Sequence, residues 1–172
     1  NPSKIAHFKA IGIETLPLDV LSAQSIEACV SSVAELTGGS LDILVNNSGA
    51  GYNMPLADTD INAAHACFDL NVWAVLAVTQ AFLPLLLESS RGAMVVNNTS
   101  VASVTPMPGQ GVYNASKAAA AMLTDNLRIE LAPFTIKVVD LRTGAVLSHF
   151  FDNIPMRPVL PKDSIYGSVR EV

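Results

Sequence analysis

The chain has 172 residues, of which 50% are hydrophobic and 15% are charged, and its formal net charge at pH 7 is −5. This composition excludes a disordered or fibrous protein, and the acidic balance gives no electrostatic footprint for nucleic acid. Cys29 and Cys67 lack metal-ligand or redox spacing, so we expect buried thiols and no metal site. There is no signal-peptide pattern, and polar residues and Pro84 interrupt the apolar run 72–87. We therefore expect no membrane span but a single cytoplasmic domain over 1–172, with contact at a membrane surface left open.

Predicted strands and helices alternate along the chain. Each strand is a short apolar run, and each helix repeats apolar residues at helical spacing. Gly38 ends the first helix, and Asp58 to Asp60 offer N-caps for the second. After residue 148 the apolar pattern weakens and prolines predict an ordered loop. The predicted strands span 11–18, 41–45, 92–97 and 135–141, and the predicted helices span 22–36, 61–88 and 113 to about 133.

This alternation predicts βαβ units. We therefore expect an α/β fold, a doubly wound parallel sheet with helices on both faces. Ligands bind outside the carboxyl ends of the strands in such sheets. Asp19, Asn46, Ser100 and Val146 lie at or after the ends of predicted strands, so we expect these residues to converge on one edge of the sheet.

Tyr113 and Lys117 lie four residues apart in the last predicted helix and so share one face. An ammonium group near a phenol favours the phenolate and lowers the pKa of the tyrosine. Such a tyrosine could pass a proton to or from a substrate oxygen near neutral pH. The same spacing is common in ordinary helices with the lysine in solvent, so the pair needs support from other residues.

Three other features supply that support: the loop Asn46-Asn47-Ser48-Gly49, then Asn71, then Ser100. Together with Tyr113 and Lys117 they resemble the short-chain dehydrogenase/reductase family. The loop looks like the family's N-N-A-G turn with serine in place of alanine, and the four other residues match its catalytic tetrad in order and spacing. The resemblance covers nearly the whole chain and implies a Rossmann-like fold. Within the family, the sequence looks closest to fungal reductases similar to 1-acyldihydroxyacetone-phosphate reductase.

The resemblance implies a role for each member of the tetrad. Tyr113 would be the general acid for carbonyl reduction or the base for alcohol oxidation, and Lys117 would lower its pKa and hold the nicotinamide ribose. Ser100 would hydrogen-bond the substrate oxygen, although a serine there could simply cap a turn. Asn71 would bend its helix and position a water that relays protons to Lys117, or it could be a purely structural polar residue.

A nicotinamide cofactor follows from the same resemblance, with NADP expected and NAD possible. Asp19 could instead cap the following helix, and Gly49 could instead serve a tight turn at positive φ. The cofactor-binding residues that the resemblance implies are Asp19 near the adenine, Asn46 near the adenosine ribose, Gly49 in close approach, Val146 and Ser148 near the carboxamide, and Tyr113 with Lys117 at the nicotinamide ribose.

The sequence departs from the family pattern in three respects, one of which is a tail that ends where a further helix and strand would be expected. Thr143-Gly144 stands where Pro-Gly is usual, and the glycine-rich T-G-x-x-x-G-x-G loop with its strand and helix is absent. That loop normally binds the pyrophosphate, so the alternative that this chain binds no cofactor stays open. The missing strand would also leave the strand over 41–45 with an apolar edge. We expect either the central portion of a longer protein or a sheet rebuilt by pairing with another chain.

Three functions remain open from the sequence. The first is an NAD(P)(H)-dependent oxidoreductase that reduces a carbonyl or oxidises an alcohol. The second is a cofactor-independent acid–base enzyme (isomerase, dehydratase or cyclase), and the third is a non-catalytic dimerisation partner. The segment 148–166 would be the substrate-covering loop, and its Phe150, Phe151, Ile154 and Met156 predict an apolar small-molecule substrate. The helices over 61–88 and 112–132 resemble the family's dimer interface and predict a homo-oligomer.

Overall fold

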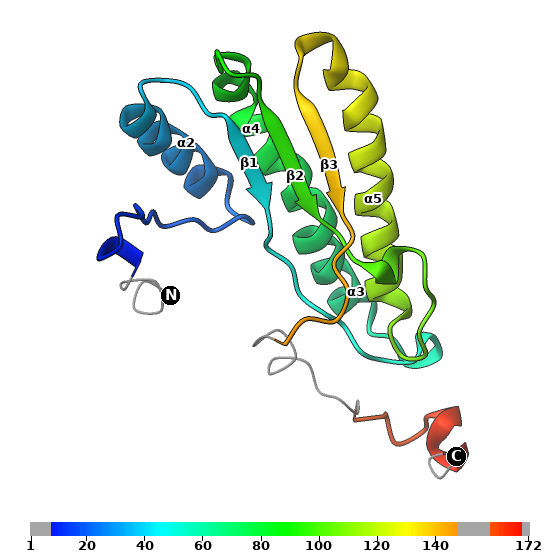
Figure 1. The fold of residues 1–172 in the computed structure, drawn as a ribbon. Helices are drawn as coiled ribbons and strands as arrows, with labels where there is room; N and C mark the ends of the chain where they lie inside the picture. Colours follow the sequence, from blue (N-terminus) through cyan, green and yellow to red (C-terminus); the bar gives the residue numbers. More distant parts are fainter. Residues whose placement is uncertain (1–7, 148–158, 170–172) are drawn as a thin grey trace.

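Three parallel strands form the sheet in the computed structural model, which describes residues 8–147 and 159–169 (Figure 1). The strands are β1 (Ile43–Asn46), β2 (Met94–Asn98) and β3 (Lys137–Leu141), in the order β1-β2-β3. Val45 lies beside Val96, and Val96 lies beside Val139. The expected α/β fold with a parallel sheet is confirmed, and three of the four predicted strands are present within a few residues of their expected bounds.

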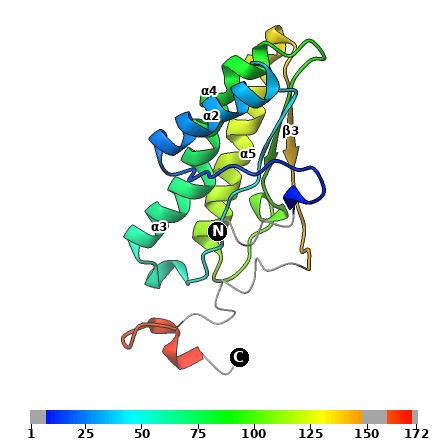
Figure 2. The same ribbon diagram turned by 90° about the vertical axis from the view of Figure 1, so that its left-hand side faces the viewer.

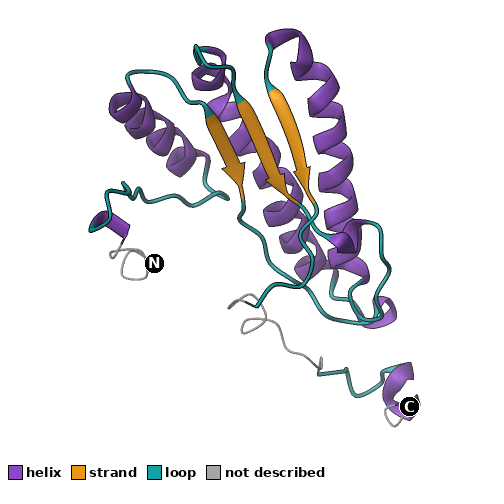
Figure 3. Ribbon diagram, in the orientation of Figure 1, coloured by secondary structure: helices purple, strands orange, loops and turns teal. Residues whose placement is uncertain are grey.

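The helices also match the predicted regions. They are α2 (Ala23–Thr37), α3 (Ile61–Phe68), α4 (Ala74–Leu87) and α5 (Gly111–Leu131) (Figure 3). The predicted helix over 61–88 is not uniform, because a π-helical turn over Asp69–Trp73 joins α3 to α4. Short 3₁₀ turns lie at Leu56–Asp58, Val101–Ser103, Ala132–Phe134 and Ile165–Val169.

The helix ends follow the capping residues in the sequence. The hydroxyl of Ser22 accepts a hydrogen bond from the Ser25 amide at the start of α2. Asp60 accepts one from the Asn62 amide at the start of α3, as the sequence predicted. At the other end of α2, Gly38 adopts φ 72°, a left-handed conformation that glycine takes without strain.

The helices α2, α4 and α5 cover one face of the sheet (Figure 2). Both crossovers, from β1 to β2 and from β2 to β3, step in the same direction across the sheet. Right-handed crossovers that step the same way place their helices on the same side. In the part of the chain that the structure describes, the opposite face carries no helix, so helices on both faces are not seen there.

The core lies between the sheet and these helices. Val95 on β2 is completely buried, and Leu86 on α4 is 1% exposed. The strands alternate between residues that face this core and residues on the uncovered face, where Ile43 and Val45 are more than half exposed. The carboxyl ends of all three strands therefore meet at one edge, beside the π-helical turn and the start of α5.

The strand predicted over 11–18 is wrong. Residues 13–19 form an extended loop without ladder hydrogen bonds, after a short helical turn at 8–9. Among the described residues β1 pairs only with β2, so this segment has no neighbouring strand to join. Its apolar residues are used differently: Leu16 and Val20 pack against the core, whereas Ile13 stays exposed.

The helical region 61–87 is long and apolar enough to cross a membrane by length and composition alone. The core helix of a soluble protein passes the same test. Val72, Val78 and Phe82 within this region are at most 4% exposed and lie in the core.

The outer faces of α4 and α5 expose large apolar side chains. Met122 and Ile129 on α5 are 61% and 74% exposed, and Trp73 at the start of α4 is 55% exposed. The homo-oligomer expected through these helices stays a prediction, which sedimentation of the purified chain would test.

The expected substrate-covering loop lies mostly outside the described residues, because 148–158 are not described. Phe150, Phe151, Ile154 and Met156 fall within that range. Beyond it, the hydroxyl of Ser164 donates a hydrogen bond to Asp58. The covering role of 148–166 therefore stays a prediction.

We predict that Leu86→Ala lowers the free energy of unfolding by about 2–5 kcal/mol, because it removes a fully buried side chain and leaves a cavity. Leu87→Ala is the matched control, since Leu87 is 48% exposed and its loss should cost less than about 1 kcal/mol. Urea unfolding of both variants measures the difference. Equal losses would show that α4 does not pack as described.

Candidate active site

Asn71 lies in the π-helical turn and is 1% exposed. Its Oδ1 accepts a hydrogen bond from the Ala50 amide at 3.0 Å, and its Nδ2 donates to the Ala50 carbonyl at 2.9 Å. Nδ2 also lies 3.0 Å from the Ser116 hydroxyl oxygen on α5. The expected bend in the helix is thus a π-helical turn, a feature common at functional sites. The Asn71 amide connects that turn to the loop after β1 and to α5.

Tyr113 and Lys117 both lie in the first two turns of α5, as expected. The Lys117 side chain is 6% exposed, and its Nζ donates a hydrogen bond to the Asn98 carbonyl at the end of β2 at 2.9 Å. Nζ lies 6.0 Å from the centre of the Tyr113 ring. The lysine therefore does not face solvent, so the alternative of an ordinary helical pair with a solvated lysine is wrong.

Ser100 begins the 3₁₀ turn after β2. Its hydroxyl oxygen accepts a hydrogen bond from the Ala102 amide at 3.1 Å, so it does cap this turn. It also forms a side-chain hydrogen bond with Tyr113. The capping role and the expected role beside Tyr113 are therefore both compatible with its position.

Burial determines how the pair titrates. It raises the pKa of Tyr113 above its ordinary value, while the hydrogen bond with Ser100 lowers it. It lowers the pKa of Lys117, because the charged ammonium loses water. The Tyr113 shift is opposite to the one expected from Lys117, since loss of hydration outweighs any stabilisation of the phenolate. In this chain Tyr113 is therefore a protonated phenol at neutral pH.

Gly49 approaches two of these residues closely. A Cβ atom added to Gly49 would lie 3.1 Å from Oδ1 of Asn71 and 3.4 Å from Nζ of Lys117. The backbone φ of Gly49 is not positive, so the alternative of a turn needing left-handed backbone is wrong. A larger residue at this position would therefore press on the Asn71 side chain.

Asn46 points into the interior. Its Nδ2 donates to the Thr79 hydroxyl and to Oδ1 of Asn97, each at 2.9 Å, and Asn97 donates in turn to Thr124. This ladder crosses from α4 through β1 and β2 to α5, and the sequence did not reveal it. Both Nδ2 hydrogens of Asn46 are thus used inside the protein, so a cofactor contact from Asn46 would come from its Oδ1 or its backbone.

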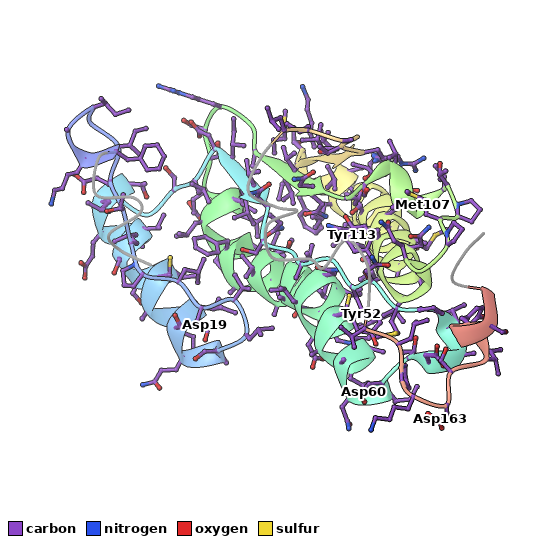
Figure 4. The ribbon with its side chains drawn as sticks, turned by 90° about the horizontal axis from the view of Figure 1, so that it is seen from below. Asp19, Tyr52, Asp60, Met107, Tyr113 and Asp163 are labelled. Atoms are coloured by element: carbon purple, nitrogen blue, oxygen red, sulfur yellow. The ribbon has the colours of Figure 1, made fainter. Side chains whose placement is uncertain are left out.

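Asp19 lies beside α2, away from Tyr113 and Met107 (Figure 4). Its carboxylate accepts a hydrogen bond from the Leu21 amide, while Ser22 caps α2, so the helix-cap alternative for Asp19 is wrong. A pocket of about 100 Å³ lies next to it. This pocket is not lined by Tyr113, Lys117 or Ser100. Its lining residues are Leu18, Val20, residues 44–48, Leu70, Ala74, Val75, Val78 and Phe82.

Val146 follows β3 and is 57% exposed, whereas Ser148 lies outside the described residues. Thr143 stands where proline is usual in the family, and its hydroxyl donates a hydrogen bond to the side chain of Asn98. Its carbonyl accepts one from the Val101 amide. Thr143 thus joins the ends of β2 and β3 near Ser100.

Two residues of the site were missed from the sequence. Ser116 is completely buried, and Cys67 donates a hydrogen bond to its hydroxyl at 3.8 Å. The signal for Ser116 was its position three residues after Tyr113, on the same helix face. In the described ranges, 8–147 and 159–169, no group of His, Cys, Asp and Glu could hold a metal ion.

The family model described as short chain dehydrogenase matches residues 3–157. A short-chain dehydrogenase/reductase of Pestalotiopsis microspora is 50% identical over 173 residues, which is 99% of this chain and 57% of the relative. A short-chain dehydrogenase of Talaromyces islandicus is 38% identical and covers 100% of this chain and 61% of its own length. The chain thus spans about three fifths of these relatives. The narrower likeness to 1-acyldihydroxyacetone-phosphate reductase is not confirmed.

Solved structures agree with this match. An alcohol dehydrogenase of Thermococcus sibiricus, complexed with 5-hydroxy-NADP, superposes with a TM-score of 0.77 at 32% identity, over 91% of this chain and 66% of that one. A short-chain dehydrogenase/reductase of Burkholderia phymatum, in complex with NAD, gives 0.80 at 27% identity, over 87% and 54%.

We predict that Gly49→Ala lowers the free energy of unfolding by about 1–3 kcal/mol, because the new methyl group presses on Oδ1 of Asn71, whose hydrogen bonds to Ala50 and Ser116 resist the small shift needed. Gly144→Ala is the control: its Cβ would meet nothing within 4 Å, so stability should be unchanged or slightly higher. Thermal or urea unfolding measures both. A harmless Gly49→Ala would mean that the loop does not pack on Asn71.

Proposed function

The chain belongs to the short-chain dehydrogenase family. We propose that it acts as an NAD(P)(H)-dependent oxidoreductase that reduces a carbonyl or oxidises an alcohol. The observation that carries the proposal is the meeting of Tyr113, Ser100 and Lys117 at the carboxyl ends of the strands. A proton donor, a second hydroxyl and a buried cation there are what a carbonyl oxygen needs as negative charge develops on it.

Tyr113 acts as the general acid in the direction of reduction. Its raised pKa keeps the phenol protonated at neutral pH, so it has a proton to give to the substrate oxygen. Ser100 hydrogen-bonds Tyr113 and orients the phenol; its one hydrogen goes to the substrate oxygen only when the hydroxyl turns away from Tyr113. In the direction of oxidation, Tyr113 must first lose its proton, which burial opposes and a nearby cation favours.

Lys117 supplies that cation, and a hydrogen bond to the Asn98 carbonyl holds its ammonium group in position. One of the three ammonium hydrogens goes to the Asn98 carbonyl, which leaves two for ribose hydroxyls and water. The Asn71 side chain is already bound to Ala50 and Ser116. A water that relays protons to Lys117 would therefore bind the backbone of the π-helical turn, where the helical hydrogen-bond pattern is interrupted.

The residues around Tyr113 suit the nicotinamide end of a nicotinamide dinucleotide, which when bound supplies or accepts the hydride. Tyr113, Lys117 and Val146 would lie at the nicotinamide end. The adenosine end would lie on the side of Asp19 and Asn46, where the pocket of about 100 Å³ is too small to enclose it. We propose NADP as the cofactor; the complexes of the similar structures hold either 5-hydroxy-NADP or NAD.

An apolar substrate is proposed from the surface near Tyr113. Val101, Val104 and Met107 precede Tyr113 in the chain and are 44%, 64% and 48% exposed. Met107 and Tyr113 come from the same end of the molecule (Figure 4). Exposed apolar side chains beside a proton donor favour a ketone or alcohol with a hydrocarbon chain over a small polar one.

We predict that the wild-type protein oxidises NADPH in the presence of ketones of increasing chain length, with a preference for the longer members. Tyr113→Phe should lower the rate at least about 100-fold, because it removes the general acid. Tyr52→Phe is the matched control: the Tyr52 hydroxyl accepts a hydrogen bond from the Asp60 amide at the start of α3, so its loss should leave the rate within about twofold.

Two results would contradict the proposal. Full activity of Tyr113→Phe would exclude Tyr113 as the acid. Turnover of substrate without any dinucleotide would indicate a cofactor-independent acid–base enzyme instead. A preference for the smallest polar ketones would refute the apolar substrate alone.

A further inference from the structure

Ser116 occupies the point where α5 meets the rest of the site. It is 0% exposed, and its hydroxyl donates a hydrogen bond to the Tyr113 carbonyl at 2.7 Å. The same oxygen accepts from Nδ2 of Asn71 at 3.0 Å and from the Cys67 thiol at 3.8 Å. The hydroxyl therefore uses its one hydrogen and both lone pairs on protein groups.

We infer that Ser116 is a positioning residue for the proposed reaction, which fixes the Asn71 amide relative to the backbone of Tyr113. This inference rests on the proposed function. Ser116 touches neither substrate nor cofactor in this role. It acts through Asn71, whose other hydrogen bonds hold the Ala50 backbone in the loop that packs on Lys117.

The geometry explains why a hydroxyl is needed at this position. The Asn71 amide has two hydrogens, and the Ala50 carbonyl takes one of them at 2.9 Å. The other reaches Ser116, with the Cys67 sulfur at 3.4 Å as a weaker alternative acceptor. Without the Ser116 hydroxyl, a fully buried N–H would have only sulfur to bond, and the amide would be held by its two bonds to Ala50 alone.

The same helix contains a matched arrangement outside the site. Thr124 is also 0% exposed, donates its hydroxyl hydrogen to the Ala120 carbonyl at 2.7 Å, and accepts from Nδ2 of Asn97 at 2.9 Å. Ser116 and Thr124 thus each use a buried hydroxyl to bond a carbonyl of their own helix and an asparagine amide. The two sites differ in what that asparagine holds: Asn71 bonds the Ala50 backbone, whereas Asn97 bonds the Asn46 side chain at the end of β1. Thr124→Val is therefore the control for Ser116→Ala.

The first test is amide hydrogen exchange at Ala50, measured by NMR on the purified chain without cofactor. Ser116→Ala should speed exchange of the Ala50 amide roughly five- to tenfold, because its acceptor on Asn71 loses the bond that ties it to α5. Thr124→Val should leave it within about twofold. Equal acceleration in both variants, or none in Ser116→Ala, would overturn the inference.

The second test is a double-mutant cycle on the ketone-reduction rate. Ser116→Ala should lower kcat roughly tenfold with KM nearly unchanged, and should have little further effect in an Asn71→Ala background. A full additional loss in that background would overturn the inference, because Ser116 would then act without Asn71. If the wild-type protein reduces no ketone, the proposed function fails, and the Ala50 exchange still decides whether Ser116 positions Asn71 and the loop.

Discussion

The hydrogen bonds of the Asn71 amide organise the candidate site. This side chain is buried in the π-helical turn between α3 and α4, and it bonds both backbone groups of Ala50 as well as Ser116 on α5. A buried amide of this kind is costly unless all its groups are paired. Satisfying it requires the loop after β1, the turn and α5 to come together, and that same arrangement brings Gly49 against Lys117.

The site gains its chemistry from burial. Tyr113 and Lys117 both lose water on α5, which raises the pKa of the phenol and lowers that of the ammonium. Both shifts favour the neutral forms, so the pair does not begin as phenolate and ammonium. Ser100 opposes the shift on Tyr113 through its hydrogen bond. The central claim of this account is that Tyr113 is a buried proton donor, protonated at neutral pH and held by Ser100 where a carbonyl oxygen can be received.

The sequence predicted much of this arrangement and missed parts for physical reasons. Apolar periodicity and caps such as Asp60 located the helices, and the tetrad residues could be named from their order. The strand over 11–18 was wrong because a strand needs a partner, which no local pattern reveals. The roles of Ser116 and Asn46 depend on contacts between distant segments, so spacing could not show that one binds Asn71 and the other Thr79 and Asn97. The direction of the Tyr113 pKa depends on burial, which spacing also does not give.

Titration of the Tyr113 phenol tests the central claim most directly. Tyrosinate absorbance of the wild-type protein minus that of Tyr113→Phe isolates this group from the other tyrosines. The account predicts a midpoint above the ordinary value of about 10, and a still higher midpoint in Ser100→Ala, since that variant loses the hydrogen bond that lowers the pKa. A midpoint below about 10, or one that Ser100→Ala leaves unchanged, would contradict it.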